Sequence, residues 1–131
     1  MIARPMFRTI VIGTDASDTA RQAVREAVEV ASALAASIEL VSAYAPGRRE
    51  DAEAMLREAG AEVEAAGVTV RTYAREGDAA DAILDVAEER GADLIVVGNK
   101  GMTGAKRFLL GSVPNKVSHH APCSVLIIRT S

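Results

Sequence analysis

The chain lacks tryptophan, and aromatic residues make up only 3% of its 131 residues. Proteins that bind single-stranded nucleic acid stack bases on aromatic side chains, so we do not expect that class here. The single cysteine, Cys123, excludes an internal disulfide framework and fits a reducing cytoplasm. No apolar run approaches the roughly 20 residues of a membrane span, and the first residues lack a signal-peptide pattern, so we expect neither feature.

What is present suits one globular domain. The apolar fraction of 49% and the charged fraction of 25% are ordinary for a soluble protein. The net charge of −3 argues against a general attraction to nucleic acid or membranes. We find no linker, internal repeat or low-complexity segment, and we therefore predict a single domain spanning residues 1–131.

Short β-branched segments alternate with segments of helical period. We expect strands at 8–14, 37–44, 68–74, 93–98 and 123–129, and a final helix at 112–120. Ser17 and Asp78 are expected N-caps, and Gly91 is expected to follow the end of a helix. The face of the first helix that is expected to be buried consists of Ala20, Val24, Ala27, Ala31 and Leu34.

This alternation predicts an α/β fold, a parallel sheet with helices on both faces. The apolar runs "TIVIG", "LIVVG" and "SVLIIR" are typical of strands buried on both sides. Ligands of such sheets bind beyond the carboxyl ends of the strands, where the strand order reverses. Two loops at that edge are candidates: "GTDASD", which places Asp15 at the tip of the first strand, and residues 96–117 after the fourth strand.

The segment 96–117 combines glycine with positive charge and has no Asp or Glu. Its basic residues are Lys100, Lys106, Arg107 and Lys116. Its glycines follow the pattern G-x2-G-x9-G-S, from Gly98 to Ser112, which is neither a dinucleotide fingerprint nor a Walker A loop.

The physics of this segment nevertheless favours phosphate binding. Glycine lets the backbone approach an oxygen cluster, and successive free N–H groups form an anion nest. Gly111 and Ser112 lead directly into a helix, whose first N–H groups attract an anion. Pro114, early in that helix, removes only an N–H that would be unpaired there.

The motif G-x2-G-x9-G-S, followed by a closing strand, resembles the ATP-binding signature of the universal stress protein (UspA) superfamily. "IVIGTDASDTARQAVREA" is similar to the first strand and helix of that family, and the resemblance covers essentially the whole chain. It implies a Rossmann-like fold of the adenine nucleotide alpha hydrolase type, with five parallel strands in the order 3-2-1-4-5. It also implies a cytoplasmic homodimer that binds ATP and acts in stress response or signalling.

Carried over by position, the resemblance implies roles for single residues. Asp15 would lie by the ribose or a metal ion, Mg²⁺ or Mn²⁺, with Thr14 and the backbone of Gly13 beside it. Ala43 would offer backbone groups to adenine, and Val97 would pack at the nucleotide. The residues implied to hold the phosphates are Gly98, Gly101, Gly111, Ser112 and Val113.

Two departures from the family pattern leave the ligand open. The region between the second and third strands is short, so any lid there is small. Pro114 stands where many members carry a hydroxyl residue, which removes one phosphate contact. Some relatives, including ones whose loop opens with "GN" and closes with "GSVP" as here, bind cyclic AMP, so ATP and cyclic AMP remain alternatives.

Other interpretations of these residues remain. Asp15 would also be suited to cap the first helix, a role compatible with ligand contact, and the glycines would serve as turns in a dimeric interaction module without nucleotide. The joint spacing of the glycines with Ser112 argues against that module. No separate general base is identifiable, so we expect at most slow ATP hydrolysis.

The last strand, 123–129, is expected at the edge of the sheet. It carries no proline or inward charge between Ser124 and Ile128, so it invites pairing with another chain. A two-fold homodimer would pair this strand antiparallel with its own copy, with Val125 and Ile127 across the seam.

Overall fold

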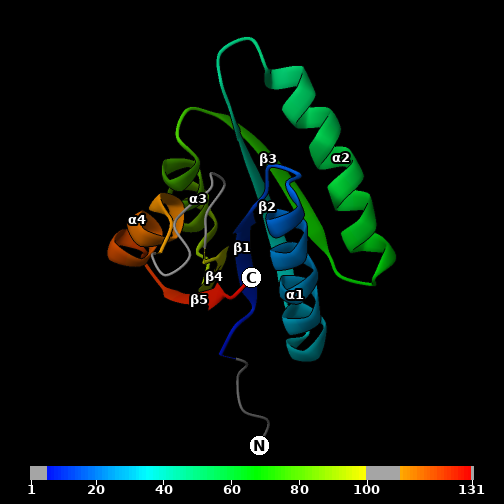
Figure 1. Ribbon diagram of the computed structural model, residues 1–131. Coiled ribbons are helices and arrows are strands. Elements are labelled where there is room, and N and C mark those ends of the chain that lie inside the picture. The colour runs from blue at the N-terminus through cyan, green and yellow to red at the C-terminus, as the bar shows by residue number, and fades with distance from the viewer. Residues whose placement is uncertain (1–5, 100–109, 131) are drawn as a thin grey trace, which may run out of the picture.

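The computed structural model describes residues 6–99 and 110–130. Strands and helices alternate along the chain, as Figure 1 shows. The strands are β1 (Thr9–Gly13), β2 (Ser37–Tyr44), β3 (Val70–Glu76), β4 (Leu94–Gly98) and β5 (Ser124–Ile128). The helices are α1 (Asp18–Leu34), α2 (Arg49–Ala65), α3 (Ala79–Arg90) and α4 (Ser112–His120).

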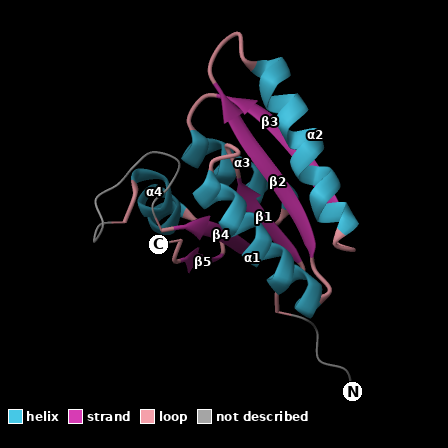
Figure 2. Cartoon of the chain, turned by 45° about the vertical axis from the view of Figure 1, so that its right-hand side comes forward, coloured by secondary structure: helices cyan, strands magenta, loops and turns pink. Residues whose placement is uncertain are grey.

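The five strands form one parallel sheet in the order β3-β2-β1-β4-β5, which confirms the expected fold class and strand order. Helices α1 and α2 cover one face of the sheet, and α3 and α4 cover the other (Figure 2). No helix within residues 6–99 and 110–130 is both long and apolar enough to cross a membrane.

The central strands β1 and β4 are apolar on both faces, and helices cover each face. The expectation that "SVLIIR" is buried on both sides was wrong, because β5 lies at the edge of the sheet and has no buried residue. Along β1, Ile10 and Ile12 point into the cluster under α1 and α2, and Val11 points into the cluster under α3 and α4. All three side chains are at most 1% exposed. Successive side chains of a strand point to opposite faces, so a continuous apolar run such as β1 contributes side chains to both hydrophobic clusters.

The ends of the helices follow the expected local chemistry. The Ser17 hydroxyl accepts a hydrogen bond from the Ala20 N–H at 3.2 Å, and an Asp78 carboxylate oxygen accepts one from the Asp81 N–H at 3.0 Å. Gly91 ends α3 in the left-handed conformation, with φ 61°. Both predicted N-caps and the predicted helix end are confirmed.

The buried face of α1 differs from the prediction at its end. Alanines fill the buried positions of the helix (Ala20, Ala23, Ala27 and Ala31), and these small side chains let α1 lie close to the sheet. Leu34 was expected to be buried but is 39% exposed. The reason is that α1 ends there, at Ala35 in the left-handed conformation, and Ala36 takes the buried place instead.

Strand β3 begins two residues later than the sequence suggests. Its pairing with β2 runs from Ile38 opposite Val70 to Tyr44 opposite Glu76, so Val68 and Thr69 lie before the strand. Helix α2 approaches β3 closely at Gly60, where an added Cβ would lie 3.2 Å from the Thr72 methyl carbon. This close approach gives a packing reason for a glycine inside a helix.

Candidate functional site

The candidate site lies where the carboxyl ends of β1 and β4 meet. From β1 the chain crosses through α1 to β2 on one side, whereas β4 and β5 lie on the other side. The crossover helices diverge at this switch point and leave a crevice between the two strand ends. The loops after β1 and after β4 both begin here, as the sequence predicted.

The turn after β1 is held by its own side chains. The buried Thr14 donates its N–H to the Val41 carbonyl at 2.8 Å, and its hydroxyl accepts from the Ala16 N–H at 3.2 Å. Asp15 accepts from the Ser17 N–H at 2.9 Å. Ala16 has φ 66°, a left-handed conformation that non-glycine residues rarely adopt and that occurs often at functional sites.

Asp15 therefore braces the turn, and Ser17 rather than Asp15 supplies the cap of α1. The Asp15 side chain is exposed and lines the cavity described next. Bracing and ligand contact are compatible roles for this carboxylate.

The larger cavity at this edge has a volume of about 440 Å³. Loops after β1 and β2 form two of its walls, and the start of α3 forms a third. Its lining residues are Gly13, Thr14, Asp15, Val41, Ala43, Tyr44, Ala45, Pro46, Gly77, Ala79 and Ile83. Four residues of the predicted set therefore share one cavity, and its volume lies in the range usual for small-molecule sites.

The backbone of Ala43 faces this cavity because β1 is shorter than β2. Neighbouring residues of a strand direct their backbone polar groups to opposite sides. The Val41 carbonyl accepts from Thr14 on the β1 side, whereas the Tyr44 carbonyl accepts from Gly77 on the β3 side. Ala43 lies two residues after Val41, so its backbone polar groups point to the same side as those of Val41. The pairing of β1 with β2, however, ends at Val41. The N–H and C=O of Ala43 thus point beyond the end of β1.

A narrower recess of about 20 Å³ adjoins this cavity and shares Gly13 and Ile83 with it. The tips of β1 and β4 and the starts of α1 and α4 surround it. Its lining residues are Gly13, Thr19, Ala20, Ala23, Ile83, Val97, Gly98, Val113 and Pro114. The structure thereby brings Val97, Gly98 and Val113 of the predicted set beside Gly13.

Helix α4 begins at this recess with unpaired donors. Gly111 is its N-cap, no side chain caps it, and the Asn115 N–H donates to the Gly111 carbonyl at 3.0 Å. Ser112 and Val113 occupy the next two positions, and their N–H groups have no acceptor within the described ranges. Pro114 has no N–H. Two free amides at a helix N-terminus favour an anion.

Part of the predicted loop lies outside the described residues: Gly101, Lys100, Lys106 and Arg107. Lys116, the remaining basic residue of the segment 96–117, is described and pairs with two carboxylates. Its ammonium lies 2.8 Å from an Asp81 oxygen and 3.4 Å from an Asp78 oxygen, so it joins α4 to the start of α3. The hydrogen bond from the Asp81 N–H, followed by the one from Lys116, holds the pKa of Asp78 below its usual value.

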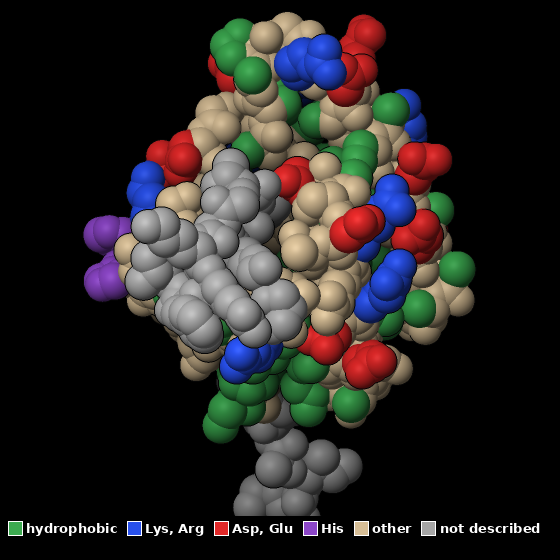
Figure 3. Space-filling model, viewed as in Figure 1, with side chains coloured by type: hydrophobic (Ala, Val, Ile, Leu, Met, Phe, Trp, Pro, Cys, Tyr) green, Lys and Arg blue, Asp and Glu red, His purple; other side chains and the backbone are tan. Residues whose placement is uncertain are grey.

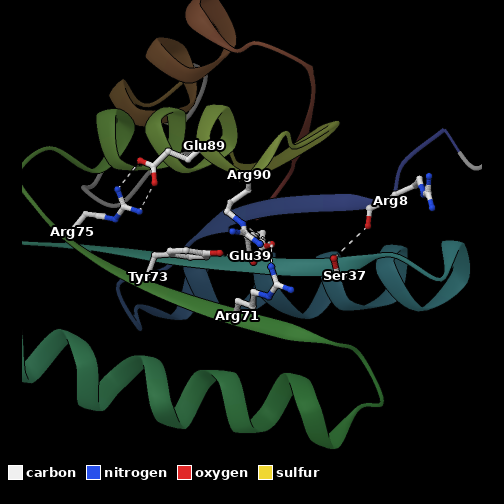
Figure 4. A network of polar contacts seen from close by, with 8 residues as sticks. All are labelled: Arg8, Ser37, Glu39, Arg71, Tyr73, Arg75, Glu89 and Arg90. Atoms are coloured by element: carbon white, nitrogen blue, oxygen red, sulfur yellow. Dashed lines mark hydrogen bonds and ion pairs between the residues drawn. The ribbon is translucent and has the colours of Figure 1, made fainter.

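A polar network at the opposite edge of the sheet was missed by the sequence analysis (Figure 4). Glu39, on β2, is 4% exposed and accepts a hydrogen bond from the Tyr73 hydroxyl at 3.1 Å. Arg71 from β3 and Arg90 from α3 reach the same carboxylate oxygen, at 3.9 and 3.6 Å. Burial, and then the charge of Glu39, raise the pKa of Tyr73. These contacts fix α3 against the sheet.

A further cavity of about 150 Å³ lies between α1 and α2 and is lined by charges of both signs, among them Arg21, Arg25, Glu58 and Glu62. Arg side chains are interspersed with Asp and Glu side chains over these two helices (Figure 3). Such a mixed surface selects no particular ligand charge. Within the described ranges, no group of three or more His, Cys, Asp and Glu side chains is arranged to hold a metal ion.

A family model described as "Universal stress protein family" matches residues 6–129. The chain belongs to the universal stress protein family. The universal stress protein Rv1636 of Mycobacterium tuberculosis is 37% identical to it over 145 residues, covering 95% of this chain and 98% of the relative.

Solved universal stress proteins share the fold. A universal stress protein crystallised in complex with cAMP has 40% sequence identity and a TM-score of 0.82, covering 95% of this chain and 98% of that one. The universal stress protein of Archaeoglobus fulgidus, in complex with dAMP, has 28% identity and a TM-score of 0.73, covering 95% and 99%. Some members of the family therefore bind adenine nucleotides.

Proposed function

We propose that this universal stress protein binds an adenine nucleotide across the two adjoining cavities at the carboxyl edge of its sheet. The observation that carries the proposal is the backbone edge of Ala43, which extends past the last β1 residue paired with β2, has no backbone partner among the described residues, and faces a cavity of about 440 Å³. Relatives with cAMP and dAMP support the ligand class. In this assignment, the base and ribose occupy the larger cavity.

Backbone groups of Ala43 are suited to adenine. The N–H donates to a ring nitrogen of adenine, and the C=O accepts from its exocyclic amino group. At the corresponding positions guanine has a ring N–H donor and an exocyclic oxygen acceptor, so the backbone edge of Ala43 disfavours guanine. Gly13, Thr14 and Asp15 line the wall next to this edge, where the ribose hydroxyls lie in the proposed complex.

The phosphates lie toward the narrower recess in this proposal. Gly98 lets the backbone come close, and the amides of Ser112 and Val113 supply two donors at the start of α4. The Ser112 hydroxyl is a third donor on the same turn. Gly111 holds the turn in place, and Gly101 remains a candidate contact by its position in the motif.

The number of phosphates is the part of the ligand that the proposal leaves to experiment. ATP is favoured by the complete G-x2-G-x9-G-S motif. Cyclic AMP is the alternative, favoured by the 40% identical relative in complex with cAMP and by Pro114, which leaves α4 only two free amides for an anion. Both ligands use the same cavities.

A metal ion fits this site only with help from the nucleotide. Asp15 is the one charged side chain among the described residues that line the two cavities. Mg²⁺ or Mn²⁺ is commonly held by one or two carboxylates together with phosphate oxygens and water, so Asp15 would supply one ligand. One carboxylate without a positioned base supports binding better than turnover, and we propose no catalytic residue.

We further propose that the protein is a cytoplasmic homodimer that pairs through β5. This strand ends the sheet, and its Ile127 side chain is 41% exposed. An apolar edge strand without proline or inward charge is a template for another strand. A two-fold axis would pair the edge with its own copy and cover both.

The test of the binding proposal is titration calorimetry of the purified protein with ATP, ADP, AMP, cAMP and GTP. We expect heat for at least one adenine nucleotide and none for GTP at the same concentration. A folded sample that binds no adenine nucleotide at millimolar concentration would refute the proposal.

A further inference from the structure

Asn99 joins three segments of the chain beside the narrower recess. It directly follows β4, and its N–H donates to the Ile128 carbonyl at 2.8 Å. Its own backbone carbonyl accepts from the Gly111 N–H at 2.9 Å. Its side-chain oxygen accepts twice from Thr130, from the N–H at 2.9 Å and from the hydroxyl at 3.0 Å. All four bonds have good lengths.

These bonds fix the start of α4 relative to the tip of β4. Gly111 is the N-cap of α4, and its N–H is held by Asn99. The amides of Ser112 and Val113 follow immediately, so their position relative to Gly98 depends on that bond. Asn99 follows β4 and Gly111 precedes α4, so the hydrogen bond between their backbones joins the end of β4 directly to the start of α4.

Thr130 supports this arrangement from the C-terminal side. It is 8% exposed, although it lies beyond the last strand. Its methyl carbon is the nearest atom, at 3.4 Å, to a Cβ built on Gly98. Thr130 therefore packs against the strand tip that lines the recess, and both of its donors are used by Asn99.

The chemistry of this position selects asparagine. A side chain must accept two hydrogen bonds while the backbone makes two more. A neutral carboxamide does this without adding negative charge. Aspartate has the same shape and accepts the same bonds, but its charge would repel a phosphate group a few residues away. Alanine would leave both Thr130 donors without their acceptor.

We infer that Asn99 is the positioning residue of the phosphate half of the site, and that Thr130 is its partner. The inference rests on the proposed function and deepens it. Asn99 does not contact the base in this proposal; its side chain, bonded to Thr130, fixes the position of its own backbone carbonyl. That carbonyl holds Gly111 so that the amides of Ser112 and Val113 meet a phosphate opposite Gly98. Its loss must therefore weaken ligands that carry phosphate and spare the nucleoside.

The test compares adenosine with AMP and ATP by calorimetry, in the wild type and in the variants Asn99→Ala and Thr130→Val. For Asn99→Ala we expect an affinity for AMP and ATP lowered about tenfold and an affinity for adenosine unchanged. Thr130→Val removes the hydroxyl but keeps the N–H and the shape, so about a threefold loss is expected. The double variant should bind AMP no more weakly than Asn99→Ala alone.

Asn115→Ala is the matched control, because Asn115 is an exposed asparagine of α4 that lines neither cavity. It should bind all three ligands like the wild type. Should Asn99→Ala and Thr130→Val bind AMP as tightly as the wild type, or lose adenosine and AMP equally, the positioning role is wrong while nucleotide binding stands. A wild type that binds none of ATP, ADP, AMP and cAMP overturns both the proposed function and this inference, whereas one that binds only cAMP or ADP overturns this inference alone.

Discussion

Replacing Gly98 by alanine should raise stability and lower nucleotide affinity at the same time. Gly98 ends β4, and its φ lies outside the left-handed region. A Cβ built there meets its nearest neighbours at 3.4 Å, the Thr130 methyl, and at 3.9 Å, the Ala23 Cβ. Both are ordinary contacts, so the protein without ligand accommodates the methyl group.

The magnitudes of the two effects follow from these contacts. A glycine-to-alanine change without strain typically stabilises by about 0.4–1 kcal/mol, because the unfolded chain loses freedom. The same methyl group narrows a recess of about 20 Å³, against whose mouth the phosphates lie in the proposed complex. Overpacking of a tight contact costs about 1–3 kcal/mol, which corresponds to a loss of affinity between about fivefold and 150-fold.

Two assays measure the pair of effects. Urea denaturation without ligand should show an unchanged or higher midpoint for Gly98→Ala, and calorimetry should show weaker binding of AMP and ATP. Gly60→Ala is the control, since Gly60 also has an ordinary φ but lies on α2, away from both cavities. It should leave affinity unchanged. Full nucleotide affinity in a folded Gly98→Ala variant would show that this wall does not contact the ligand.

Three further predictions concern the rest of the molecule. Glu39→Ala should lower the free energy of unfolding by about 1–3 kcal/mol, because it leaves the Tyr73 hydroxyl without its acceptor. Glu39→Gln keeps an acceptor oxygen and should lose less. Urea denaturation compares the two variants, and equal losses would contradict the role of that hydrogen bond. The pKa of Tyr73 is raised in the folded state, so the stability it contributes is complete below the unfolded pKa near 10 and is lost as pH rises through the folded value. Tyr73→Phe should remove that alkaline loss from the pH profile of stability, and an identical profile would refute the assignment. Light scattering of the wild type should give about twice 13.7 kDa, and Ile127→Lys should shift the mass toward the monomer at micromolar concentration; a wild-type mass near 13.7 kDa at every concentration would exclude pairing through β5.

Local signals allowed much of the fold to be predicted. The bounds of β2 and α4 agree with the sequence, as do the caps at Ser17 and Asp78, because period, β-branching and capping chemistry are encoded within a few residues. The start of β3 was wrong by two residues, since pairing register is set by the neighbouring strand rather than by the local pattern.

The site was predictable where it depends on strand ends and was not where it depends on distant partners. Gly13, Ala43 and Val97 line the expected edge because parallel strands carry their carboxyl ends to one side. The tie between Asn99 and Thr130 joins residues 31 positions apart. Nothing near either residue in the sequence signals it.

The same limit applies to charges. Glu39 sits in an apolar strand and is buried only because Tyr73, Arg71 and Arg90 surround it from two other elements. Lys116 counts as a basic residue of the glycine-rich segment 96–117, but it pairs with the carboxylates of Asp78 and Asp81 at the start of α3. Charge counted along a sequence does not reveal which opposite charge folding brings beside it.

The most direct test of the central claim is an amide chemical-shift titration of isotope-labelled protein with AMP. We expect the largest shift changes at Ala43, at the edge of the larger cavity, and at Ser112 and Val113, at the start of α4, and we expect them to saturate together. Saturating changes confined to the cavity between α1 and α2, around Met55, would place the ligand there and refute binding at the carboxyl edge of the sheet.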